Sequence, residues 1–252
     1  MTGRPEQLFP LFSELETLKG IGPKTAKLLV QAGVETPRDI AFSLPYAVID
    51  RRRRTSIQGV ELPATLTVEV TVGAHRPAKT KGGAYRIHAE DAQTDFQLVF
   101  FHARGDYLKR VLPTGCTRIV SGKVELFDGV AQMVHPDHIL EPEAAGEIPE
   151  FEPVFHLTQG VTQKTMFRAV KSALGRLPVL SEWIDPALLD REGWPDWESA
   201  LNAAHALTGM DDLSPDAPAR ARLAYDEFMA HQMTLAIARR RERKARGVTS
   251  AA

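Results

Sequence analysis

Apolar and polar residues alternate most regularly between residues 64 and 140. Every second residue from Leu66 to Val72 is apolar, which is the period-two pattern of a half-buried strand. A helix is predicted over residues 104–112, where the alternation stops. The same alternation predicts further strands over residues 84–90, 95–102, 117–127 and 130–135. Three strands, a helix and two strands is the order of an OB-fold, a five-stranded Greek-key barrel that often binds oligonucleotides.

The third predicted strand carries aromatic residues on both faces. Phe96, Leu98 and Phe100 share one face and are expected in the core. Phe101 falls on the opposite face at the end of the strand, and we expect it to be exposed. In the fourth strand, Gly122 predicts a bulge or a barrel corner, because an interior glycine suits a bend.

The segment before the barrel has helical periodicity over residues 8–44. Thr36 is a predicted N-cap before Pro37, and Gly33 can end the helix that precedes it. The glycine turn Gly20-Ile21-Gly22 resembles a helix-hairpin-helix. Such a turn suits a structural brace and a phosphate contact equally well.

The segment after the barrel begins with an acidic connector over residues 141–152. Helices are then predicted over residues 162–177, 186–192, 197–207 and 219–246. The predicted fold is therefore α+β, a barrel flanked by helices. Its expected parts are an N-terminal helical segment (1–60), the OB-fold (61–141) and a helical linker region (142–252).

The composition indicates the cellular environment of the protein but not its chemistry. The single cysteine, Cys116, excludes an intramolecular disulfide and a cysteine-based zinc site. No secretory signal and no apolar run of about 18 residues is present, so we expect a cytoplasmic protein without a membrane span. The net charge is −1, but Arg51–Arg54 and residues 239–246 are basic runs. Such runs either contact nucleic acid or are simply solvated.

Catalytic motifs are not found. The Gly20–Thr25 stretch contains glycine, lysine and threonine, but it lacks the spacing of a phosphate loop. His135-Pro136-Asp137-His138 has no third metal ligand close by. We therefore expect no metal, no cofactor and no enzymatic activity in this chain by itself.

Binding residues gather around the third strand. An aromatic strand end beside basic residues suits nucleic acid, because bases stack on aromatic rings and cations neutralise phosphates. The predicted DNA-binding residues are Phe101, Tyr107, His102, Arg104, Lys79, Lys81, Arg86, Lys109 and Arg110.

An ordered set of motifs resembles the N-terminal region of the RecG family of ATP-dependent DNA helicases. The motifs run from the beginning of the chain to its last helix. They are Leu18-Lys-Gly-Ile-Gly-Pro-Lys-Thr-Ala26, Leu98-Val-Phe-Phe101, Gly122-Lys-Val-Glu125, Gln132-Met-Val-His-Pro136, Pro153–Gly160 and Ala221–Phe228.

The resemblance implies a wedge domain that splits the arms of branched DNA in recombination and repair. Phe101 and Tyr107 match the family's stacking aromatics, although His102 stands where an Asn commonly follows the Phe. The family's motor, with its ATP and magnesium sites, is not recognisable here, so the chain resembles an N-terminal fragment or a truncated form. The expected partners are replication forks, Holliday-type junctions and single-stranded DNA, bound by a monomer. The alternatives are a general single-stranded DNA-binding protein and a protein-interaction module.

Overall fold

The computed structural model describes residues 4–80 and 82–245. The chain divides into two compact units. The barrel unit is Ile49–Glu152, and the helical unit combines Met1–Val48 with Pro153–Ala252. Each unit has its own hydrophobic core.

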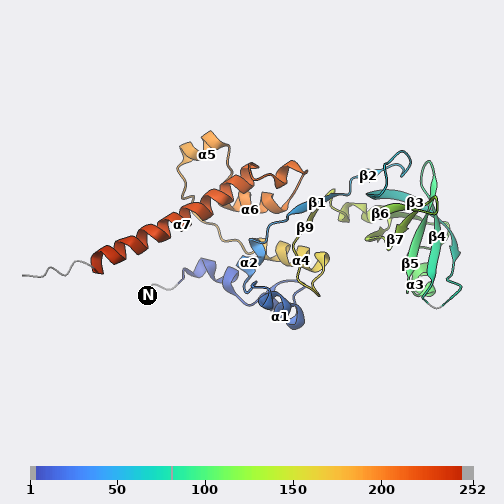
Figure 1. The fold of residues 1–252 in the computed structure, drawn as a ribbon, viewed down its shortest axis with the longest axis horizontal. Coiled ribbons are helices and arrows are strands. Elements are labelled where there is room, and N and C mark those ends of the chain that lie inside the picture. The colour runs from blue at the N-terminus through green and yellow to red at the C-terminus, as the bar shows by residue number, and fades with distance from the viewer. Residues whose placement is uncertain (1–3, 81, 246–252) are drawn as a thin grey trace, which may run out of the picture. The chain divides into compact units, whose positions relative to one another are not determined.

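The barrel unit is a closed barrel of five long strands. Its strands pair in the order β3-β4-β5-β7-β6, and β6 returns to β3 (Figure 1). Only β5 and β7 run parallel within this circuit. The bounds are β3 Ala64–Arg76, β4 Ala84–Glu90, β5 Asp95–Phe101, α3 Gly105–Val111, β6 Thr117–Phe127 and β7 Val130–Val134, with the short strands β2 Arg53–Arg54 and β8 His138–Leu140 alongside. The predicted order of three strands, a helix and two strands is confirmed, as is the α+β barrel.

The register of β4 and β5 explains which residues form the barrel core. Phe100 lies opposite Tyr85, Leu98 opposite Ile87, and Phe96 opposite Ala89. Paired residues of an antiparallel ladder share a face, and all of these side chains are buried. The predicted core face of the third strand is confirmed.

Strand β3 is longer than the pattern predicts. The alternation ends at Val72, but β3 continues through His75 and Arg76 after a register irregularity that follows Val72. The His75 ring supplies the reason, because its Nδ1 lies 3.0 Å from the Tyr85 hydroxyl and its Nε2 lies 2.8 Å from the carbonyl oxygen of Leu112. These contacts fasten the end of β3 to β4 and to the end of α3.

Gly122 allows a close approach of two neighbouring segments. The β3–β6 ladder runs through it without a shift in register, so no bulge lies there. A Cβ at this position would lie 3.1 Å from Met133 and from the backbone of Pro136.

Arg51 does not belong to a solvated basic run. Its side chain is only 3% exposed and pairs with Asp137 at 2.9 Å and with Glu152. Its Nη1 also donates to Ser121 Oγ at 2.9 Å. The next two arginines pair with acids as well, Arg52 with Asp50 and Arg53 with Glu69. The acidic connector is therefore more than an exposed linker, because Glu152 partners Arg51.

The helical unit is built from short helices and one long one. Its elements are η1 Glu6–Phe12, η2 Leu15–Thr17, α1 Pro23–Gln31, α2 Pro37–Ala41, α4 Gln163–Leu174, α5 Pro186–Glu192, α6 Trp197–His205, η4 Asp211–Leu213 and α7 Pro218–Ala245. Strands β1 Ala47–Asp50 and β9 Phe151–Val154 pair with each other where the chain passes between the units, and η3 Pro142–Glu147 belongs to the barrel unit.

The caps of the N-terminal helices follow the prediction, but the helix type before Gly20 does not. Thr36 accepts from the Asp39 backbone N–H in a full capping box, and Gly33 has a φ of +84° after α1. The expectation of α-helix before Gly20 is wrong, because 3₁₀ turns lie there. Pro10 lies inside η1, where it cannot donate a backbone hydrogen bond. Glu14, between η1 and η2, has extended backbone, so the two segments do not join into one helix.

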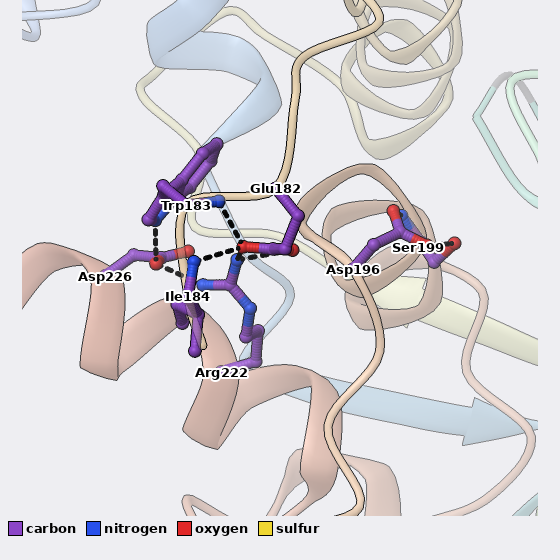
Figure 2. A network of polar contacts seen from close by, with 7 residues as sticks. All are labelled: Glu182, Trp183, Ile184, Asp196, Ser199, Arg222 and Asp226. Carbon is purple, nitrogen blue, oxygen red and sulfur yellow. Dashed lines mark hydrogen bonds and ion pairs between the residues drawn. The ribbon is translucent and has the colours of Figure 1, made fainter. Parts of the chain in front are cut away.

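A polar network around the buried Arg222 connects α7 to the chain before α5 (Figure 2). Arg222 is fully buried and pairs with Asp226 and with Glu182, the latter at 2.8 Å. Trp183 Nε1 donates to Asp226 at 2.8 Å, and the Arg222 guanidinium lies 5.1 Å from the Trp183 ring. The nearby Asp196 forms a separate N-cap with Ser199.

Candidate nucleic-acid interface

One end of the barrel collects the residues that the sequence predicts for binding. Ala84 lies opposite Phe101, so β4 begins where β5 ends. The β3–β4 connection and the beginning of α3 must therefore lie at that same end. We call it the Phe101 end.

Phe101 is the exposed aromatic of this end. Its side chain is on the face opposite the core and is 42% exposed. The chain turns sharply after it, because His102 has a φ of +57°. A Cβ at Gly82 would lie 3.5 Å from the His102 ring, so the β3–β4 connection contacts the residue that follows Phe101.

Helix α3 presents Tyr107 to solvent. Leu108 and Leu112 are buried in the barrel core and anchor the helix. Gly105 lies against the Tyr85 ring, where an added Cβ would approach to 3.3 Å. Tyr107 is left 52% exposed, with the Arg110 guanidinium 5.7 Å from its ring.

The predicted cations are on the surface. Arg86 shares the outer face of the sheet with Phe101, because Arg86 lies opposite Val99 and Phe101 opposite Ala84. Lys81 lies outside the described residues. The other predicted cations are all exposed, namely Lys79, Arg86, Arg104, Lys109 and Arg110.

His135 is a residue of this end that sequence reasoning considered only as a weak metal ligand. The Phe101 N–H donates to its Nε2 at 3.1 Å, and the two ring centroids are 5.9 Å apart. In the described residues no group of three or more histidine, cysteine or acidic side chains could hold a metal ion. The partner of His135 is 34 residues away in the chain, so local spacing could not have found it.

The opposite end of the barrel has a different character. Gln97 pairs with Gln132 in the parallel β5–β7 ladder, so the β6–β7 turn lies beyond the beginning of β5. At that turn Leu126, Phe127 and Val130 are exposed. Exposed carboxylates flank the turns of this end at Glu90, Asp95 and Asp128, and the exposed Arg53 and Arg54 line the same surface as Glu90.

The chain matches a known protein family over most of its length. A model described as the RecG wedge domain matches residues 14–177. The chain belongs to the RecG wedge domain family. The resemblance inferred from the motifs is thereby confirmed, and no helix among residues 4–80 and 82–245 is long and apolar enough to cross a membrane.

Three relatives are described as ATP-dependent DNA helicase RecG. The protein of Bacillus subtilis is 28% identical over 240 residues, covering 92% of this chain and 33% of the relative. The protein of Pasteurella multocida is 26% identical, covering 88% and 33%, and that of Aquifex aeolicus is 22% identical, covering 92% and 31%. This RecG wedge chain thus spans about a third of the length of the curated relatives it matches.

A solved structure extends the likeness to the fold. It is described as RecG bound to a three-way DNA junction, and it matches with a TM-score of 0.73 at 22% identity. The match covers 97% of this chain and 33% of that one. The RecG wedge chain therefore shares its fold with the corresponding part of that protein.

Proposed function

We propose that this chain binds branched DNA at the Phe101 end of its barrel and splits the duplex arms there. The observation that carries the proposal is the exposed Phe101 at the end of β5, among exposed cations on β4, α3 and their connections. Membership of the RecG wedge domain family supports it, as does the junction-bound relative of the same fold.

Each part of the Phe101 end has a role in this proposal. Phe101 and Tyr107 cap the base pair next to the split, because an aromatic ring on a base contributes about 1–3 kcal/mol. Lys79, Arg86 and Lys109 hold the arms by their phosphates, which makes the affinity fall with salt.

The wider role of the relatives belongs to the same proposal. A longer protein with a RecG motor would supply translocation by ATP and magnesium, and the wedge would direct it to stalled forks in recombination and repair in the cytoplasm. The helix-hairpin-helix-like turn before α1 is a brace in this scheme. The chain works on DNA as a monomer.

The first prediction concerns Phe101. Phe101→Ala should weaken binding to a forked DNA roughly 5- to 150-fold, from the loss of about 1–3 kcal/mol of stacking, and should barely change duplex binding. The measurement is a salt-titrated binding assay with forked, duplex and single-stranded DNA side by side.

Phe127→Ala is the matched control. Phe127 is 56% exposed on the same barrel, but it lies at the opposite end, and it should leave fork binding unchanged. Equal loss on fork and duplex in Phe101→Ala would remove the stacking role. A preference for single strands over forks would favour a general single-stranded DNA-binding protein, and salt-independent or missing DNA binding would favour a protein-interaction module.

A further inference from the structure

The last residue of β5, Phe101, lies beyond the end of the neighbouring strand β7 and is bonded there by the side chain of His135. The last pair of the β5–β7 ladder is Val99 with Val134. His135 then leaves the strand with a φ of +47°, in the left-handed region that side chains rarely adopt. Phe101, two residues beyond Val99, therefore has no β7 backbone opposite it.

The imidazole of His135 replaces that missing backbone. The His135 N–H donates to the Val99 carbonyl oxygen at 2.9 Å, and its Nε2 accepts from the Phe101 N–H at 3.1 Å. A ring nitrogen accepts only without a proton, so this geometry requires the neutral ring with its proton on Nδ1.

The same ring also contacts both neighbouring phenylalanines. Its centroid is 5.9 Å from the buried Phe100, edge to face, and 5.9 Å from the exposed Phe101 at a tilt of 42°. Phe101 is paired with Ala84 of β4 on one side, and the chain turns away directly after it, at His102. On the other side, where β7 has ended, the contact to Phe101 comes from His135.

We propose that His135 is a positioning residue for the stacking aromatic, holding Phe101 in place before DNA arrives. The proposal rests on the proposed function of Phe101. Its physical reason is preorganisation, because a ring and backbone that are already fixed lose less conformational freedom on binding. In this proposal His135, although itself exposed, acts through Phe101.

The test is a double-mutant cycle with His135→Asn and Phe101→Ala. Asn tolerates the left-handed backbone, but its side chain is too short to place an acceptor where Nε2 lies. His135→Asn should weaken fork binding about three- to tenfold, the loss expected from freeing one immobilised side chain. In the Phe101→Ala background it should add nothing, and it should not change duplex binding.

His135→Gln is the rescue variant, because its longer side chain can bring an oxygen to the position of Nε2. It should keep fork affinity close to that of the unmodified protein. Losses that multiply in the double variant would show that His135 acts independently of Phe101, and an unchanged affinity in His135→Asn would show that it does not matter. If Phe101→Ala itself leaves fork binding intact, the proposed function fails instead.

Hydrogen exchange in the unmodified protein tests the same bond without relying on a variant that folds. Hydrogen exchange of the Phe101 amide in the DNA-free protein should be slowed, as expected for a bonded N–H at a strand end. Exchange at the rate of an unprotected amide would overturn the proposal, since the bond to His135 would then be absent before DNA binds.

Discussion

Arg222 is a buried charge that is paired with two carboxylates. Its side chain has no exposed surface, and Glu182 and Asp226 balance its charge. Burial by itself would raise the pKa of Glu182, but the backbone N–H of Ile184, the Arg222 guanidinium and the N–H of Trp183 together hold that pKa below its ordinary value. The Glu182 carboxyl therefore stays ionised at neutral pH.

Removing the guanidinium should be costly because it leaves two carboxylates without their cation. Arg222→Ala is expected to lower the free energy of unfolding of the helical unit by about 3–5 kcal/mol. Urea unfolding followed by tryptophan fluorescence measures this, since Trp183, Trp194 and Trp197, the three tryptophans of the chain, all belong to the helical unit.

Arg191→Ala is the control for this residue. Arg191 pairs with Glu192 in the same unit, but its side chain is largely exposed. Its loss should change the free energy of unfolding by less than about 0.5 kcal/mol. A similar small effect from Arg222→Ala would mean that the buried pair contributes no more than a surface one.

Strand β6 is the element that closes the barrel, because it pairs with β3, β7 and β8. Gly122 lies in the middle of it, where Met133 and Pro136 approach closely. Gly122→Ala should therefore overpack the barrel and cost about 1–3 kcal/mol. Urea unfolding of the barrel unit followed by circular dichroism measures the change.

Gly146 provides a comparison within the same unit. It lies in η3, and an added Cβ would meet nothing within 4 Å. Gly146→Ala should be close to neutral, because it adds a methyl group in open space. Equal costs for the two glycines would show that the effect is backbone propensity rather than crowding at Gly122.

Local patterns were sufficient to predict most elements of the whole molecule. Alternation gave β6 as Thr117–Phe127 and the order of the barrel, and N-cap chemistry gave the beginning of α2. The exposure of Phe101 was also predictable, because it lies on the strand face opposite the core residues Phe96, Leu98 and Phe100.

The parts that sequence reasoning missed depend on contacts distant in the chain. Arg51 looked like one member of a basic run, and its partner Glu152 lies 101 residues away. His135 looked like a weak metal ligand, and its partner is on another strand. Periodicity reports which face a residue lies on, but it does not report which distant side chain will meet it.

The Arg51 network makes the barrel unit self-contained. Arg51 and Glu152 lie where the chain enters and leaves the unit, and Asp137 and Ser121, the other partners of Arg51, are inside it. The core of the barrel also comes from residues of this unit alone. A fragment of residues 49–152 therefore keeps both its core and the contact that joins its two ends.

This fragment is expected to fold by itself with a cooperative urea transition. Within it, Arg51→Ala should lower the free energy of unfolding by about 3–5 kcal/mol, because Glu152 loses its cation at a half-buried site. Arg54→Ala, from the same run but exposed, should change the free energy of unfolding by less than about 0.5 kcal/mol.

Amide spectra of the fragment that match those of the same residues in the whole chain would establish the native fold. A fragment that stays unfolded while the whole chain folds would show that the barrel depends on the helical unit, and equal effects of the two arginines would show that the ends are not joined through Arg51.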